Sequence, residues 1–187
     1  MLVALNNDQR FEADAAEKGL DYYCPNCRGE VILKKGRIVI HHFAHKAETV
    51  CLFAKPESPG HVKAKGLFQN LYKERGHKAD IEFIVHTLPN DRRADVMVHP
   101  PKGRPVAIEL QDSTIDLDEI EKRTQGYCNA GIPVLWLPFA RKKYWDEKIP
   151  SDDAGWNFLI SKYAARPFER WIHGYNFKEG AEVAKTR

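Results

Sequence analysis

The sequence DRRADVMV (residues 91–98), followed by VAIELQDS (106–113), decides the fold that we predict for this chain. Apolar and polar residues alternate along both pieces with the period of two that is typical of β-strands with a buried face. In the first piece, Ala94, Val96 and Val98 are predicted to share one face. The sequence therefore predicts two neighbouring strands with polar residues on the opposite face.

The segment HPPKGRP (99–105) separates these strands, and its proline and glycine residues turn the chain because they cannot continue a strand. A hairpin centred on Lys102 places Asp95 directly opposite Glu109, and opposed residues have Cβ atoms ~5 Å apart. Two carboxylates this close repel each other unless one is protonated or a cation lies between them. Gln111 lies one step along the same face and is predicted to contact the same substrate.

Two interpretations of this acidic pair are open. Asp95 and Glu109 could both be solvated on an exposed face. However, the later apolar run VLWL (134–137) predicts a further strand and a sheet covered on both sides, where acidic groups need a partner. A divalent cation with oxygen ligands is the simplest such partner.

The composition is that of a globular protein, with 187 residues, a mass of 21.5 kDa and 43% hydrophobic residues. No apolar run approaches the ~20 residues of a membrane span, and the first residues lack the pattern of a secretory signal. We therefore expect a cytoplasmic protein without membrane association. The formal charge of +3 is compatible with a polyanionic partner but is weak evidence for one.

A cysteine and histidine cluster precedes the predicted sheet. CPNC (24–27) is a Cys-x-x-Cys knuckle, residues 31–40 predict a hairpin that turns at Lys35-Gly36, and HHFAH (41–45) and Cys51 follow. Two ligand pairs joined by a hairpin are typical of a zinc ribbon, because tetrahedral Zn²⁺ takes four cysteine or histidine ligands. A thioredoxin-like redox pair is disfavoured, because no βαβ unit surrounds the motif. Free cysteines with surface histidines are the remaining alternative.

This cluster offers one ligand more than zinc needs. The softness of thiolates favours Cys51, and the i, i+3 spacing of the histidines mirrors the cysteine pair. We predict a structural zinc site made by Cys24, Cys27, His45 and Cys51, with His42 as the rival ligand.

A helix is predicted from Glu57 to Gly76, with one polar and one apolar stripe. Glu57, His61 and Lys65 follow each other at i, i+4 and i+8. They could simply form a solvated face. If the helix instead packs against the acidic hairpin, Glu57 completes a cation site of three carboxylates.

The remaining core elements are a strand over 79–87, a helix from Ile115 to about Ala130 and a buried strand over 132–137. On the second helix, Arg123 is predicted to reach a phosphate and Tyr127 to stack on a base or sugar. An i, i+4 Glu–Arg pair and a packed tyrosine are the alternative. The predicted class is therefore α/β, with a mixed sheet flanked by helices.

The chain resembles the competence protein CoiA family and, more broadly, the PD-(D/E)xK nuclease superfamily with its restriction-endonuclease-like core. The motifs that carry the resemblance span residues 20 to 138 in family order. They are CPNC (24–27), HFAHK (42–46), Cys51, Glu57-Ser58 with His61 and Lys65, RADV (93–96), AIELQDS (107–113), Arg123 with Tyr127, and PVLW (133–136).

This resemblance implies an amino-terminal zinc-binding domain (1–54) and a nuclease-like core that acts on DNA (55–140), linked to DNA processing, uptake or recombination. The basic and aromatic residues that follow predict a carboxy-terminal extension (141–187). The resemblance also implies that Glu57, Asp95 and Glu109 bind Mg²⁺ or Mn²⁺. Gln111 occupies the position of the superfamily lysine and brings no positive charge. Lys65 could supply that charge from the helix.

The sequence leaves three hypotheses for function. The first is a metal-dependent DNA nuclease that uses Glu57, Asp95, Glu109, Gln111 and Lys65. Its predicted DNA contacts are His61, Arg93, Arg123 and Tyr127. The second is a non-catalytic DNA-binding or recombination-assisting module, and the third is a zinc-stabilised protein-interaction domain. The expected partner is single- or double-stranded DNA, with a recombinase or helicase as a further candidate.

Overall fold

The computed structural model describes residues 1–46, 50–51, 54, 57–111, 113, 115–138, 172–176 and 182–186. Most of the predicted basic and aromatic extension, including RKKYW (141–145) and RPFERW (166–171), lies outside the described residues. Two strands of that region, β10 (Ile172–Asn176) and β11 (Glu182–Thr186), pair antiparallel. No helix among the described residues combines the length and the apolar character that crossing a membrane requires.

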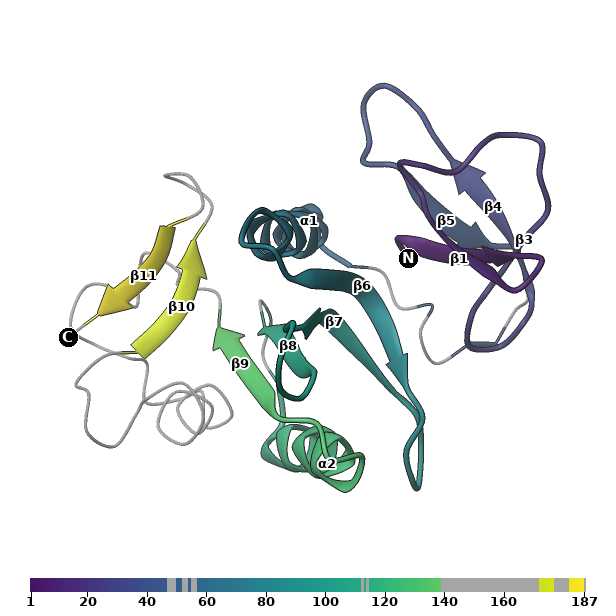
Figure 1. Cartoon of the computed structure of the whole chain (residues 1–187). Coiled ribbons are helices and arrows are strands. Elements are labelled where there is room, and N and C mark those ends of the chain that lie inside the picture. Colours follow the sequence, from purple (N-terminus) through teal and green to yellow (C-terminus); the bar gives the residue numbers. More distant parts are fainter. Residues whose placement is uncertain are drawn as a thin grey trace.

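An antiparallel five-stranded sheet forms the amino-terminal element, in the order β2-β1-β3-β4-β5. Figure 1 labels four of these strands, β1, β3, β4 and β5. Its strands are β1 (Val3–Asn6), β2 (Gln9–Glu12), β3 (Tyr22–Tyr23), β4 (Glu30–Lys34) and β5 (His42–His45). Buried Tyr22 and Phe43 pack with ring centroids 5.0 Å apart. These rings and Cys24 belong to one apolar cluster, so a small core of its own supports the cysteine knuckle.

The loop between β4 and β5 corrects the predicted hairpin. Val31 pairs with His45 and Lys34 with His42, so the returning strand begins at His42 and residues 35–41 connect the two strands. The predicted turn at Lys35-Gly36 is therefore too early. Burial of Phe43 in the small core accounts for this register, because a shift by one residue would turn its ring to the other face.

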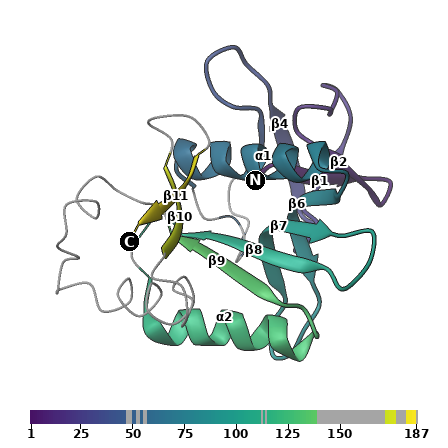
Figure 2. The same ribbon diagram turned by 60° about the vertical axis from the view of Figure 1, so that its left-hand side comes forward.

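A four-stranded mixed sheet with one helix on each face forms the second part of the chain (Figure 2). Strands β6, β7 and β8 are antiparallel, and β9 runs parallel to β8. The order of elements predicted for the nuclease-like core is confirmed: α1 (Pro59–Glu74), β6 (Lys78–Val85), β7 (Arg92–His99), β8 (Val106–Gln111), α2 (Leu117–Asn129) and β9 (Val134–Pro138).

The first helix starts two residues later than predicted. Ser58 is its N-cap and accepts a hydrogen bond from the His61 N–H, so Glu57 lies just before the helix. His61 and Lys65 remain one turn apart on the helix face that meets the sheet.

The register of β7 and β8 is the one that a turn centred on Lys102 predicts, with Val96 opposite Ile108 and Val98 opposite Val106. The prediction for Ala94 needs correction, because Ala94 packs with Met97 on the α2 side rather than with Val96 on the α1 side. An irregularity in the neighbouring strand accompanies this change of face.

Glu82 in β6 has φ +51°, and the pairing of β6 with β7 skips residue 82 between Ile81↔Val96 and Phe83↔Ala94. A left-handed residue interrupts the alternation of faces along a strand. The strict alternation predicted for β7 therefore fails at this position.

Strand β1 joins the two parts of the chain. Leu2 and Val3 belong to the same buried cluster as Ala64 and Phe68 of α1. Polar contacts reinforce this junction, since the Gln69 amide donates to Glu12 Oε1 over 2.6 Å. The first strand of the amino-terminal element is thus part of the core of the second.

Candidate functional site

Four side chains at one edge of the amino-terminal sheet form a group suited to a metal ion. The ligand atoms of Cys24, Cys27, His45 and Cys51 all lie within 4.8 Å of one another. The two sulfurs of Cys24 and Cys51 are 3.9 Å apart, and Cys27 Sγ lies 3.4 Å from His45 Nε2. Such spacings suit a tetrahedral ion with ligand bonds of roughly 2.0–2.3 Å.

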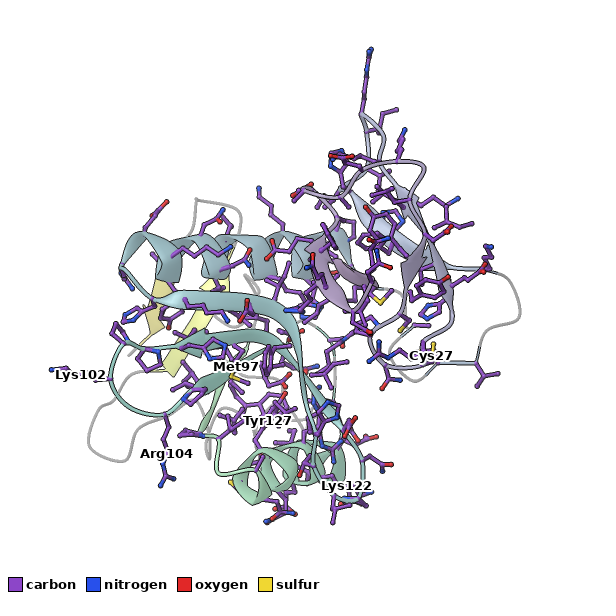
Figure 3. All side chains as sticks on the ribbon, turned by 45° about the vertical axis from the view of Figure 1, so that its right-hand side comes forward. Cys27, Met97, Lys102, Arg104, Lys122 and Tyr127 are labelled. Carbon is purple, nitrogen blue, oxygen red and sulfur yellow. The ribbon has the colours of Figure 1, made fainter. Side chains whose placement is uncertain are left out.

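Local backbone geometry prepares this Cys₃His group. The Asn26 N–H points at Cys24 Sγ over 3.4 Å, and Arg28, with φ +59°, closes the knuckle by donating to the Cys24 carbonyl. The four favoured ligands are the ones that the structure gathers (Figure 3 labels Cys27), whereas His42 lies outside the group and its Nδ1 is 2.9 Å from the Ile40 carbonyl. This group can bind a metal ion such as zinc.

A second cluster lies where α1 meets the sheet, and Lys65 is at its centre. The Lys65 side chain is fully buried, and its Nζ is 2.6 Å from Glu57 Oε2, 3.2 Å from Asp95 Oδ1 and 3.3 Å from Glu82 Oε1. An ammonium has three donors, so these three carboxylates can satisfy all of them. Helix α1 therefore packs against the acidic hairpin, and the alternative of a solvated polar stripe does not hold.

Two further cations complete this acidic centre, which we define as Glu57, His61, Lys65, Glu82, Arg93 and Asp95. His61 Nε2 lies 3.1 Å from Asp95 Oδ2, and its Nδ1 lies 3.5 Å from Glu57 Oε2. The Arg93 guanidinium donates to Glu57 Oε1 over 2.9 Å. His61 and Arg93, both predicted to contact DNA, thus already hold carboxylates of the centre.

The charges of the acidic centre stabilise one another. Burial would raise the pKa of Glu57, but the hydrogen bond from His61 and the charges of Lys65 and Arg93 outweigh it and lower that pKa to about 2. Asp95 behaves alike, since Lys65 and His61 overcome burial and hold its pKa well below its usual range.

His61 shows the reciprocal effect. Burial would lower its pKa, but its bonds with Asp95 and Glu57 raise it to about 9. At neutral pH the carboxylates of Glu57 and Asp95 are therefore ionised beside a charged imidazole.

Asp95 lies where β7 and β8 separate. The pairing of these strands ends at Val96↔Ile108, and beyond it Asp95 Oδ2 accepts the Leu110 N–H over 2.9 Å. Glu109, the next residue in register, turns to α2, where its carboxylate accepts hydrogen bonds from the Tyr127 hydroxyl and Arg123. The two opposed acids are thus held by different helices.

A metal ion that bridges all three predicted carboxylates stays a prediction. Among the described residues, Glu57, Asp95 and Glu109 do not form a ligand group of the kind that the Cys₃His side chains form. Lys65 is shared by Glu57 and Asp95, whereas Glu109 interacts with Asp95 through its charge. The structure therefore brings two of the three together and leaves the third adjacent.

The two α2 residues predicted to contact DNA are occupied by other contacts. Tyr127 is fully buried between the sheet and α2, close to Met97 (Figure 3), so its ring cannot stack on a base. Arg123 pairs with Glu109 instead of Glu119 and lies over the Trp136 ring, 5.1 Å from its centroid. This corrects the prediction for Tyr127: the packed tyrosine is what the structure contains.

Gln111 ends β8, and its side chain is buried there. The Gln111 amide donates to the Ser113 carbonyl over 2.7 Å. The group at the position of the superfamily lysine therefore stabilises the start of the connection to α2. The buried positive charge of this region comes from Lys65 instead.

Comparison with known proteins identifies the family. A family model described as "Competence protein CoiA, nuclease-like domain" matches residues 57–168, which is more than half of the chain. This chain belongs to the CoiA family. A second model, "Competence protein CoiA, N-terminal domain", matches residues 5–54, the range that contains the Cys₃His group.

One curated CoiA protein is similar to 62% of the chain. Competence protein CoiA of Bacillus subtilis (strain 168) is 33% identical over 117 residues, which cover 62% of this chain and 31% of that protein. The chain thus spans about a third of the length of this curated relative. A crystal structure of the protein of unknown function AF1548 aligns with 54% of this chain and 65% of its own, at 18% identity and a TM-score of 0.34.

Glu82 is the member of the acidic centre that sequence reasoning missed. Ile81, Phe83 and Val85 predict that residue 82 faces away from the core, yet Glu82 is 1% exposed. Its position depends on the positive φ and on contacts with residues distant in the chain, which a period-two pattern does not contain. The one signal for Glu82 in the sequence was an acidic residue in a strand of a sheet predicted to be covered on both sides.

We expect Glu109 to make the stability of this CoiA-family protein depend on pH. Burial, with a contribution from the Asp95 charge, raises the pKa of Glu109 from 4.5 to about 7. Because the folded state binds the Glu109 proton more tightly than the unfolded state, the protonated carboxyl stabilises the fold. This stabilisation is complete below pH 4.5 and is lost as the pH rises through 7. The stability difference between the wild type and Glu109→Gln should thus fall by on the order of 3 kcal/mol over that window.

Urea unfolding of both proteins at several pH values between 4 and 8 measures this change. Glu74→Gln, an exposed substitution on α1, serves as the control and should leave the pH profile of the wild type unaltered. A stability difference between Glu109→Gln and wild type that stays constant across this range would contradict the assignment.

Proposed function

We propose that this chain is a metal-dependent DNA nuclease that hydrolyses phosphodiester bonds with Mg²⁺ or Mn²⁺. The observation that carries the proposal is the acidic centre, in which Glu57 and Asp95 are ionised around a buried lysine. Its location inside the range matched by the nuclease-like domain supports the same conclusion. Carboxylate oxygens are the ligands that such hard cations prefer.

Glu57, Asp95 and, after reorientation, Glu109 would hold the metal ion. When bound, the ion lowers the pKa of a water molecule and polarises the phosphate oxygens. Because Lys65, His61 and Arg93 already neutralise three carboxylates, a divalent ion needs further negative charge nearby. The DNA phosphate and an ionised Glu109 supply it, so metal and DNA are expected to bind cooperatively.

The remaining groups assist hydrolysis of the phosphate ester. Water loses a proton as it adds to phosphorus, the bond from phosphorus to one sugar oxygen breaks, and the leaving oxygen takes up a proton. His61 is protonated at neutral pH and is 15% exposed, and once Glu57 and Asp95 turn to a bound ion, its N–H groups would be free to donate a hydrogen bond or a proton to the phosphate group. Lys65 supplies the fixed positive charge that Gln111 lacks.

For the Cys₃His group we propose Zn²⁺, in a structural role. Three thiolates and one imidazole are a donor set typical of structural zinc, and four protein ligands leave no open position for a substrate. The DNA substrate, single- or double-stranded, and a recombinase or helicase as a protein partner are further parts of this proposal.

Incubation with labelled single- and double-stranded DNA tests the nuclease directly. We expect cleavage with Mg²⁺ or Mn²⁺ and none when these ions are omitted from protein whose Cys₃His group is loaded with Zn²⁺. Omission is sharper than chelation, because a chelator would also strip the cysteine ligands. DNA affinity should fall with increasing salt, as phosphate contacts require.

A non-catalytic DNA-binding module is the second candidate. It is favoured because every carboxylate of the acidic centre is already paired with a cationic side chain of the protein. Salt-sensitive binding without cleavage at any metal concentration would support this alternative. Absence of DNA affinity at moderate salt would leave a zinc-stabilised interaction domain.

A further inference from the structure

Glu82 connects the acidic centre to the first strand of the chain. Its carboxylate is 1% exposed, its Oε1 lies 3.3 Å from Lys65 Nζ, and its Oε2 accepts the Leu2 N–H over 2.7 Å. One oxygen therefore faces the buried lysine, and the other is fixed by the backbone of the amino-terminal element. The Glu82 carboxylate therefore cannot rotate away from Lys65 without breaking its hydrogen bond with the Leu2 N–H.

The backbone at Glu82 is unusual for a strand. Its φ of +51° lies in the left-handed region, which residues with a Cβ seldom adopt, and the pairing with β7 skips this residue. Such strain persists where surrounding contacts enforce it, and it is concentrated at functional sites. Here it accompanies a glutamate whose side chain reaches Lys65 from a strand position predicted to face away.

Metal binding would alter the partners of Lys65 unequally. Glu57 and Asp95 hold the ammonium now, but both are predicted ligands whose oxygens would turn to a bound ion. Glu82 is anchored by Leu2 and can remain with Lys65. The lysine would then keep its position while its other two partners bind metal.

We propose that Glu82 is a positioning residue of the acidic centre. It holds the Lys65 ammonium in place, and its own position depends on the hydrogen bond from the Leu2 N–H of the amino-terminal element. This inference rests on the proposed function. It gives the amino-terminal element a part in the active site. Leu2 directly precedes β1, and β1 pairs with β3, which ends directly before Cys24.

Glu82→Gln tests the charge at this position. Glutamine has a single carbonyl oxygen, so it cannot accept hydrogen bonds from both Lys65 and Leu2 through separate oxygens. We expect kcat for metal-dependent cleavage to fall roughly 10–100-fold, as for other groups that orient a functional residue, while KM for DNA changes less than about 3-fold.

Two matched variants define the effect. Glu82→Asp keeps the charge, and aspartate tolerates positive φ, so it should restore part of kcat. Glu74→Gln removes an exposed acid of α1 and should leave kcat unchanged. A kcat for Glu82→Gln equal to that of Glu74→Gln would overturn the proposal.

The backbone link to Leu2 needs its own pair of variants. Leu2→Pro removes the N–H that donates a hydrogen bond to Glu82. Leu2→Ala keeps this N–H and removes only apolar contacts of the side chain. The proposal expects a lower kcat for Leu2→Pro than for Leu2→Ala. Equal kcat values would exclude a role for the N–H.

NMR of the lysine ammonium groups separates this proposal from the nuclease proposal. The buried Lys65 should give a slowly exchanging signal in the wild type that weakens or shifts in Glu82→Gln and Leu2→Pro but not in Glu74→Gln. If the wild type does not cleave DNA, the nuclease proposal fails while this signal still tests the position of Lys65. An unchanged Lys65 signal in Glu82→Gln would overturn the positioning role in either case.

Discussion

Replacing Asp95 with asparagine is expected to reduce metal-dependent DNA cleavage by at least about 100-fold, more than the loss of a group that only orients a metal ligand. Asp95 contacts Lys65 and His61 and is a predicted ligand of the catalytic ion. Asparagine has nearly the same shape and keeps one carbonyl oxygen for the Leu110 N–H, so the substitution removes the negative charge and the second acceptor oxygen, which faces Lys65. Cleavage rates at saturating Mg²⁺ measure this effect.

Stability must be measured beside activity, because Asp95 is one of three carboxylates around a buried ammonium. Breaking a buried ion pair costs about 3–5 kcal/mol, and here Glu57 and Glu82 still compensate Lys65, so we expect the lower end. Asp118→Asn, at an exposed position of α2, is the matched control. Full cleavage by a folded Asp95→Asn protein would exclude the metal-binding role.

The second large effect is expected from Cys24→Ser, which should lose the zinc ion proposed for the Cys₃His group and unfold the amino-terminal element. Structural zinc contributes roughly 10 kcal/mol or more in small zinc-binding peptides, and here a small apolar core that contains Cys24 retains part of the stability. Metal analysis should find about one zinc per wild-type chain and much less in the variant. Thermal unfolding measures the destabilisation.

Cys128→Ser is the control for thiol chemistry, because Cys128 is exposed on α2 and lies outside the Cys₃His group. It should leave zinc content and unfolding unchanged. If the amino-terminal element supports the acidic centre through Leu2, Cys24→Ser should also weaken cleavage, although Cys24 belongs to the Cys₃His group and not to that centre. A Cys24→Ser protein that keeps zinc and wild-type unfolding would contradict the proposed ligand set.

Local patterns were sufficient for much of this structure. The proline- and glycine-rich segment 99–105 predicted the register of β7 and β8, because a turn centre fixes which residues face each other. The spacing of Cys24, Cys27, His45 and Cys51 predicted the metal-binding group, because a hairpin brings two ligand pairs together. Helical spacing likewise placed His61 and Lys65 on one side of α1, and Glu57, just before the helix, contacts the same Lys65.

The partners of the buried charged side chains were decided only by the tertiary structure. Glu82 meets Lys65 and Leu2 because a left-handed residue interrupts β6 and because β1 packs on the second sheet. Glu109 turns to Tyr127 and Arg123 because α2 buries that face. Sequence periodicity specifies the face of a single element, but the partner of a buried charge depends on which distant element covers that face.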